Sequence, residues 1–580
     1  MLAWLFSQFQ MVLSSFLLWT SSLGIVFFQH SLPAFSVSLP SSPSSILLVP
    51  GTGAGTGNIV DTGYAQYQGN RSFENTVAYL GIPYAEPPLG ERRFRAPLPL
   101  NVTRVRQEAG GKVVDASQYP DFCVQGSTGG GDAGGAGSED CLKLNVYAPF
   151  GAKSGDNLPV LVYFHGGGYV FGNPANWPFD SWINQTPTFI AVSVYYRLDS
   201  FGFLTTPSFS DSSNGDFNAG LQDQTQSLRW IQEHIASFGG DPGRVTINGQ
   251  SAGGGSVELH LVTNVEERLF EGAIAQSVYR APNPTPEEQQ PLFEFYALQA
   301  GCGNGTVTDQ LGCLRKASIS ALARAQDAAA TSGLAYNAFH PVIDGKILTD
   351  APSNLVLQGR FAKVNLIVGA TSNETVVGGT NFTQALKLAF PRLTEDDLVG
   401  FEKVYPLSEF SSPSQQFQVA TGESLLICAR EILGSKFATT DELKAWTYRY
   451  NQPNPTSGGD AVQHAAENWM MFNGINTGFN GTGVFTQMTP VEKTFAEELI
   501  AYWVSFVRSG DPNTFKLGRS PVWEGYFTTP ATGQEVKQRI VLQQPVDGST
   551  EESGSFIEVQ PSVESGRCDF VRSVIEREEN

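Results

Sequence analysis

The first 60 residues contain no aspartate, glutamate, lysine or arginine. Within them, residues 11–28 (MVLSSFLLWTSSLGIVFF) form a long apolar run that is typical of secretory targeting. We expect a signal peptide over residues 1–36, with Ala34 and Ser36 as the small residues of its cleavage site. An uncleaved anchor is the alternative, because basic residues are missing before the run and the run is longer than a usual signal core.

Basic residues are scarce in the whole chain. Its 580 residues include 36 Lys and Arg against 56 Asp and Glu, so the formal net charge is −20. Such a field repels phosphate backbones and anionic lipid surfaces. We therefore expect no nucleic acid partner, and no stable membrane partner once the signal peptide has been removed.

The chain also lacks a long charged, proline-rich or repetitive linker that could separate independent cores. With 41% hydrophobic residues and 61 glycines, the composition is that of a globular protein with many turns. We expect one large domain over residues 37–580.

Cysteines are few, and no two of the six have the C-x-x-C spacing of zinc or redox sites. An even number without metal spacing favours disulfides in an oxidising compartment, which suits a secreted protein. The sequence leaves every pairing open, and the local choice joins Cys123 to Cys141 and Cys302 to Cys313, leaving Cys428 for Cys568. Seven N-x-S/T triplets fit a secreted glycoprotein, at Asn70, Asn101, Asn184, Asn304, Asn373, Asn381 and Asn480.

Short β-branched runs recur along the chain and predict strands that are buried on both faces. A helix is predicted between the second and third runs, because Leu221, Leu228 and Ile231 fall at helical spacing. Strand, helix and strand in this order indicate a parallel crossover and an α/β fold. The strand ranges are 158–164, 189–196, 244–248, 364–369 and 445–450, and residues 282–337 are expected to form helices over the sheet.

The stretch GQSAG (249–253) follows a predicted strand and precedes a helix start rich in small residues. This is the context of a nucleophile elbow, in which a serine on a strained turn projects above the sheet. Glycines on either side let helix and strand approach closely. The pentapeptide predicts Ser251 as a nucleophile, although a simple glycine-rich turn is as common a reading of the pattern alone.

Two further segments supply the other parts that acyl transfer needs. HGGGYVFG (165–172) follows a strand and can turn its backbone N–H groups toward one point, as in an oxyanion hole. Glu374 stands after the strand 364–369, and His464 is the one histidine that follows both Ser251 and Glu374. The order nucleophile, acid, histidine is that of α/β-hydrolases.

Taken together, these segments resemble the type-B carboxylesterases, the family that includes cholinesterases and certain fungal lipases. The resemblance extends from about Asn58 to Phe570, and a secreted member of fungal type is expected. The matching segments are YLGIPYAEPPLGERRFRAP, EDCLKLNVY, HGGGYVFG, GLQDQTQSLRWIQEHIASFGGDPGRVTINGQSAGG, PVIDG and HAAE.

This resemblance implies an α/β-hydrolase fold, with a mostly parallel central sheet flanked by helices. It implies Ser251 as nucleophile, Glu374 as acid and His464 as general base. It places the oxyanion hole at the N–H groups of Gly167, Gly168 and Ala252, and it implies the three disulfide pairings given above. The substrate is a small-molecule ester, and the reaction needs no metal or organic cofactor.

The chain departs from many relatives at two positions, with Gln250 in place of a glutamate before the nucleophile and Thr375 in place of a glycine after the acid. The first change removes a negative charge that would help to hold cationic substrates.

Four functions compete at this stage. We favour a serine esterase for small or soluble esters, because the segment between Cys123 and Cys141 has a single apolar residue larger than alanine, Val124. A lipase activated at oil–water interfaces would need a broad apolar lid there. A cholinesterase would need an aromatic side chain for the ammonium group. A non-catalytic adhesion module is a remote alternative, since the triad is intact.

Overall fold

The structure is a computed structural model that describes residues 58–125, 136–334, 338–374, 379–477, 483–528 and 536–578. The expected signal peptide, residues 1–36, lies outside these ranges, as does the middle of the Cys123–Cys141 segment, residues 126–135. Thr56–Asn580 forms one compact unit.

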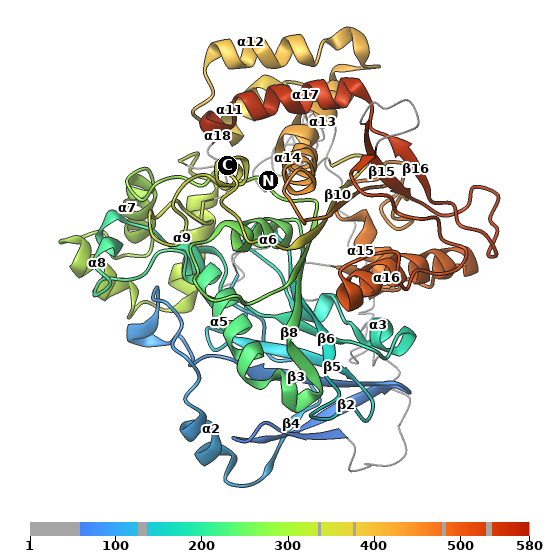
Figure 1. Cartoon of the computed structure of the whole chain (residues 1–580). Helices are drawn as coiled ribbons and strands as arrows, with labels where there is room; N and C mark the ends of the chain where they lie inside the picture. The colour runs from blue at the N-terminus through green and yellow to red at the C-terminus, as the bar shows by residue number, and fades with distance from the viewer. Residues whose placement is uncertain are drawn as a thin grey trace, which may run out of the picture. The chain divides into compact units, whose positions relative to one another are not determined.

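A central sheet runs through the described part of the chain (Figure 1). Its seven middle strands, from β7 to β15, are parallel, whereas β5 and the strands before it along the edge pair antiparallel in turn. The order is β1 (Ile59–Asp61), β2 (Gln66–Phe73), β3 (Thr76–Pro83), β5 (Lys143–Pro149), β7 (Ile190–Val194), β6 (Leu158–Phe164), β8 (Gly240–Gln250), β9 (Gly272–Gln276), β10 (Asn365–Thr371), β11 (Ala445–Tyr450), β15 (Val536–Leu542) and β14 (Phe527–Thr528), with β4 (Val113–Ala116) on β2 and β16 (Phe556–Val559) on β15.

Two cores lie on the two faces of this sheet because its middle strands are apolar throughout. In β6, Val160 and Val162 pack into one core and Leu161 and Tyr163 into the other. The first core is covered by α5 (Ala219–His234), α6 (Ala252–Val262) and α14 (Cys428–Ala438). The second is covered by α3 (Asp180–Gln185), α15 (Ala466–Met471) and α16 (Pro490–Ser509), which lie on the opposite side of the sheet in Figure 1. The expectation of a mostly parallel sheet between helices is confirmed.

The predicted strands are found at or near their expected places, with one clear difference. β8 begins at Gly240, four residues before the expected start at Arg244, because Gly240 pairs with Leu158 at the beginning of β6. The predicted helix is α5, and it ends at His234, where a 3-10 turn over Ile235–Phe238 leads to Gly239 in the left-handed region.

The helices expected over residues 282–337 are present but do not lie flat on the sheet. They are α7 (Gln290–Gln299), α8 (Val307–Leu314) and α9 (Ile319–Ala330). α9 packs against α7 and against α4 (Asp199–Phe203), and the group forms the rim of the molecule on the left in Figure 1.

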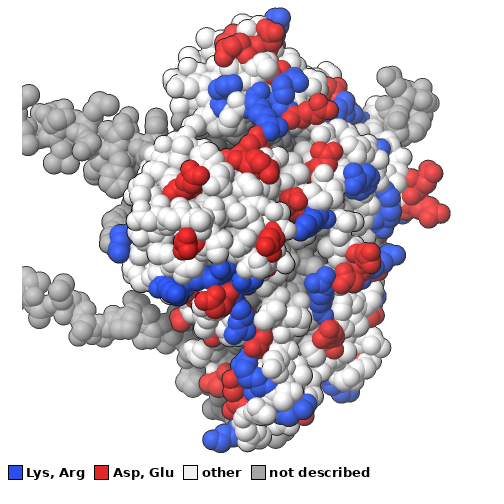
Figure 2. Space-filling view, turned by 90° about the vertical axis from the view of Figure 1, so that its left-hand side faces the viewer, with Lys and Arg blue, Asp and Glu red and all other residues white. Residues whose placement is uncertain are grey.

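Three disulfides join Cys123 to Cys141, Cys302 to Cys313 and Cys428 to Cys568. The third connects α14 to α17 (Ser562–Ser573) across 140 residues of sequence. On the face shown in Figure 2, acidic and basic side chains are interspersed, without a continuous basic area. None of the described helices is both long and apolar enough to cross a membrane.

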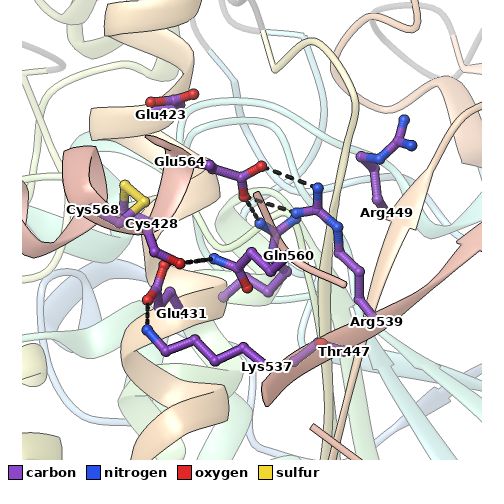
Figure 3. A network of polar contacts seen from close by, with 12 residues as sticks. Glu423, Cys428, Glu431, Thr447, Arg449, Lys537, Arg539, Gln560, Glu564 and Cys568 are labelled. Atoms are coloured by element: carbon purple, nitrogen blue, oxygen red, sulfur yellow. Dashed lines mark hydrogen bonds and ion pairs between the residues drawn. A yellow bond between two sulfur atoms is a disulfide. The ribbon is translucent and has the colours of Figure 1, made fainter. Parts of the chain in front are cut away.

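A polar network lies beside the third disulfide (Figure 3). Arg539 of β15 donates to both carboxylate oxygens of Glu564 on α17, at 2.7 and 3.0 Å, and Arg430 of α14 pairs with the same carboxylate. The side chains of Arg539 and Arg430 are almost completely buried. The disulfide and this network together hold α17 against α14 and the end of the sheet.

Candidate active site

The turn between β8 and α6 carries Ser251, with backbone angles φ 61° and ψ −125°. A non-glycine residue rarely adopts such a conformation, so the surrounding packing must impose it. A Cβ on Gly253 would lie 2.0 Å from the carbonyl oxygen of Phe164, and one on Gly249 would lie 2.3 Å from the oxygen of Gly253. The strand and the helix can meet at this angle because Gly249 and Gly253 have only a hydrogen atom as side chain.

The glycine loop that follows β6 lies directly against this turn. A Cβ on Gly166 would lie 2.5 Å from the oxygen of Gln250 and 2.9 Å from the Cβ of Ser251. Gly167 and Gly168 both have positive φ, 115° and 62°, as expected where a loop turns its N–H groups inward. Ala252 is the first residue of α6 and is buried.

His464 lies between Ser251 and Glu374, although the three residues come from well-separated parts of the chain. Its Nε2 is 2.8 Å from Ser251 Oγ, and its Nδ1 is 2.5 Å from Glu374 Oε2. Glu374 follows β10, and His464 precedes α15. The Glu374 side chain is fully buried, whereas the His464 side chain is 16% exposed.

The two charged partners shift each other's pKa. Burial on its own raises the pKa of Glu374, but the charge of His464 and the hydrogen bonds from His464, Ser277 and Thr371 outweigh it and hold that pKa below its ordinary value. Burial lowers the pKa of His464, and the charge and hydrogen bond of Glu374 reverse this, so the pKa is raised above 6.5. A carboxylate that stays ionised beside a basic imidazole is what a serine nucleophile requires.

Two of the other described histidines, His165 and His260, have different surroundings. His165 stacks on Tyr196 with Nδ1 near Gly166 O, and burial lowers its pKa to about 4. His260 lies next to Gln224, and burial lowers its pKa to about 3. Both rings are therefore neutral at ordinary pH. His30 lies outside the described residues.

Sequence reasoning missed the groups that hold the acid. Ser277 donates its hydroxyl to Glu374 Oε1 at 2.6 Å, and the N–H of Thr371 donates to the same oxygen at 2.6 Å. Ser277 directly follows β9, a strand formed by the short segment GAIAQ. Counting that segment as a parallel strand would have placed its last residues beside Glu374.

A second buried carboxylate, Glu467, was also missed. It lies three positions after His464, on the first turn of α15, and neither of its oxygens has a hydrogen-bond partner within the described structure. Burial and the nearby charge of Glu374 raise its pKa to about 7. Beside it, Asn468 donates to Gln250 Oε1 at 3.3 Å, so the glutamine that precedes Ser251 is held by the same helix.

The base of the Cys123–Cys141 segment is attached to the glycine loop. Gln125 accepts a hydrogen bond from the N–H of Gly172 and donates to its oxygen, at 3.1 and 2.8 Å. Val124 is buried. Among the described residues, no group of three or more His, Cys, Asp or Glu side chains is placed to hold a metal ion.

Comparison with known proteins gives this arrangement its family. The profile of the Carboxylesterase family matches residues 56–551. Acetylcholinesterase of Electrophorus electricus is 29% identical over 520 residues, covering 78% of this chain and 80% of its own. Lipase 5 of Diutina rugosa is 34% identical over 372 residues, covering 57% of this chain and 66% of its own.

The crystal structure of Aspergillus niger EstA has a TM-score of 0.76 and 29% identity to this chain, covering 90% of it and 99% of EstA. The expected α/β-hydrolase fold is thereby confirmed. The chain belongs to the carboxylesterase family and is a hydrolase of carboxylic esters with small-molecule substrates.

Proposed function

We propose that the protein hydrolyses its esters through an acyl-enzyme on Ser251, with His464 as general base and Glu374 as the acid that orients it. The observation that carries this proposal is the contact of His464 with both partners, at 2.8 Å to Ser251 Oγ and 2.5 Å to Glu374 Oε2. The base is thus within hydrogen-bond reach of the nucleophile on one side and of the orienting group on the other.

In the first half of the reaction, His464 takes the proton of Ser251 as Oγ attacks the ester carbonyl, and then gives it to the leaving alcohol. In the second half, His464 takes a proton from water, which attacks the acyl-enzyme and releases the acid. Glu374 keeps Nδ1–H of the imidazole directed toward itself and stabilises the imidazolium that forms in each half.

The oxyanion of each tetrahedral intermediate is bound by the N–H groups of Gly167, Gly168 and Ala252. Support comes from the close approach of the glycine loop to the elbow and from the position of Ala252 at the start of α6. An N–H at a helix start is free of an intrahelical partner and favours negative charge.

The substrates are small or soluble esters. Interfacial activation requires an apolar surface to contact the lipid, and the one large apolar residue between Cys123 and Cys141, Val124, is buried. Choline esters are disfavoured, because Gln250 brings no negative charge next to Ser251.

The protein is secreted as a single domain over residues 37–580, after removal of residues 1–36. The three disulfides support this location, since such bonds persist in oxidising compartments. Neither nucleic acid nor a membrane surface is a partner, given the net charge of −20.

A series of p-nitrophenyl esters of increasing acyl length tests both the mechanism and the substrate class. Turnover should be highest for short acyl chains and should fall by a factor of about 10⁵ or more in Ser251→Ala. Ser212→Ala, which changes an exposed serine, is the matched control and should be as active as the wild type.

Each other outcome rejects a defined part of the proposal. Residual turnover in Ser251→Ala at the level of the control would reject the nucleophile. Preference for long chains, with a rise in rate above the substrate's solubility limit, would identify a lipase instead. A wild type as inert as Ser251→Ala on every ester would point to a binding module.

A further inference from the structure

A fully buried ion pair joins two distant parts of the chain outside the proposed triad. Arg280 lies four residues after β9, and its Nη2 is 2.8 Å from Oε2 of Glu578 on α18 (Ile575–Glu578). Neither side chain has any exposed surface. An ion pair so deeply buried is expensive to desolvate, so its presence calls for a reason beyond stability.

Arg280 makes further contacts with the π-helical turn η7 (Glu423–Ile427). Its Nη1 donates to Ser424 O at 2.7 Å, and its backbone N–H donates to Leu425 O at 3.0 Å. The turn η7 in turn begins next to the catalytic acid, because a Cβ on Gly422 would lie 3.3 Å from the carbonyl carbon of Glu374.

The segment that leads from β9 to Arg280 is attached to both ends of the triad. Ser277 donates its hydroxyl to Glu374 Oε1. The N–H of Tyr279 donates to the backbone carbonyl oxygen of Ser251 at 3.3 Å. Displacing Arg280 would therefore disturb the support of the acid and of the nucleophile together.

The turn α18 is itself fixed from the other side. Arg577 makes two hydrogen bonds of 2.6 Å to the carboxylate of Asp397 on α12 (Glu395–Val404). Adjacent residues of α18 with opposite charges thus bind complementary charges on two separate elements. The positive charge of Arg280 also acts on another buried carboxylate, Glu258 on α6. Arg280 therefore interacts electrostatically with both Glu258 and Glu578.

We propose that Glu578 is a positioning residue for ester hydrolysis, which acts through Arg280 to hold Ser277 and η7 against Glu374. This inference rests on the proposed triad. It assigns a role in turnover to a residue 298 positions from Arg280 in sequence, on a turn that touches neither Ser251 nor His464 in the described contacts.

The test compares Glu578→Ala and Glu578→Gln with Glu576→Ala, which changes an exposed glutamate on the same turn. Each variant is assayed for kcat and KM on a short-chain p-nitrophenyl ester, and for the rate of irreversible phosphonylation by a fluorophosphonate. Thermal unfolding at the same pH measures how much of each variant is folded at the assay temperature.

We expect Glu578→Ala to lower both kcat and the phosphonylation rate about tenfold or more, with KM changed less than about twofold, since the substrate contacts are untouched. Glu578→Gln keeps the shape of the side chain, so its kcat and phosphonylation rate should lie between those of Glu578→Ala and the wild type. If Glu578→Ala does not fold, Glu578→Gln takes its place in the comparison. Glu576→Ala should match the wild type.

A lower unfolding temperature with unchanged kcat and phosphonylation rate in the folded variants would overturn the inference, because the ion pair would then be only structural. Failure of the triad proposal is recognised separately, by full activity in Ser251→Ala, whatever the Glu578 variants do.

Discussion

His464 has two buried carboxylates as neighbours, Glu374 and Glu467, and these differ in their hydrogen bonds and in their pKa. Glu374 accepts hydrogen bonds from His464, Ser277 and Thr371 and stays ionised. Glu467 has no hydrogen-bond partner for either oxygen in the described structure, and burial first and Glu374 second raise its pKa to about 7. The charge around the imidazole therefore changes with the ionisation of Glu467 in the neutral range.

This pair predicts the acid side of the pH profile. In the proposed mechanism, His464 must be neutral to take the proton of Ser251, so activity should fall as pH drops through its raised pKa, which lies above the ordinary 6.5. Glu467 contributes to that rise. Glu467→Gln should therefore move the acid limb of the kcat/KM profile to lower pH, because a neutral amide stabilises the imidazolium less.

The measurement is kcat/KM on one short-chain ester between pH 5 and 9, with Glu395→Gln as the control at an exposed glutamate on α12. An acid limb that stays in place in Glu467→Gln, or moves to higher pH, would show that Glu467 does not act on His464 through its charge.

At the level of elements, α6 crosses very close to the end of β6. Gly253→Ala would bring a Cβ to 2.0 Å from Phe164 O, which is backbone and cannot rotate away. We expect a loss of about 2–3 kcal/mol in the free energy of unfolding, from overpacking. Activity should fall as well, because Ser251 depends on that crossing for its conformation.

Gly312→Ala is the matched control, since a Cβ there meets nothing within 4 Å and the residue lies in α8. It should be neutral or stabilising by up to about 1 kcal/mol. Urea unfolding measures the free energy of unfolding of both variants. Equal stabilities for Gly253→Ala and Gly312→Ala would contradict the expected overpacking at Gly253.

The network of Figure 3 makes a prediction for acid conditions. Burial alone raises the pKa of Glu564, but the charges of Arg430 and Arg539 outweigh it and lower that pKa to about 2, from 4.5. A carboxylate with a lowered pKa stabilises the folded state at any pH above its ordinary pKa, and this stabilisation is lost as the pH falls toward 2. The unfolding temperature of Glu564→Gln should thus lie below that of the wild type at pH 6, and the gap should narrow below about pH 4.5.

The control is Glu551→Gln, at an exposed glutamate, and the measurement is the unfolding temperature from pH 7 to pH 3. A gap that stays constant over this range would mean that Glu564 acts by shape rather than by charge.

Local patterns were enough to predict the elements that carry Ser251 and the glycine loop. An apolar run followed by glycines specifies a buried strand and a sharp turn from within a few residues, as in β6 and β8. Chain order and family resemblance then singled out Glu374 and His464, which the structure brings to hydrogen-bond distance of each other.

The supporting residues could not be predicted in the same way. Ser277, Glu467 and Glu578 are ordinary polar residues in sequence, and their importance arises from contacts with residues between 90 and 300 positions away or from burial, which no local pattern encodes. The helices of residues 282–337 were recognised, whereas their packing on α4 depends on the route of the chain beyond the sheet.

At the scale of the whole molecule, the disulfides differ most in the length of chain that they close. Cys428 and Cys568 are 140 residues apart, against 11 for Cys302 and Cys313. In the loop-entropy view, the long closure stabilises by about 5 kcal/mol and the short one by about 3 kcal/mol. Replacing both long-range cysteines by serine should therefore cost more stability than replacing both short-range ones.

Urea unfolding of the two double variants under non-reducing conditions makes the comparison, with the wild type as reference. A larger loss in the Cys302→Ser/Cys313→Ser variant would show that local packing outweighs chain closure in this protein.

The same long-range bond also affects how the molecule responds to proteases. His464 lies between Cys428 and Cys568, and the residues just before it, 455–461, form an exposed loop. A single backbone cut in this loop leaves the two fragments covalently joined, with the histidine on one fragment and Ser251 on the other. Such a nicked enzyme would run as one band on a gel until a reductant is added, so damage that separates the triad in sequence need not separate it in space.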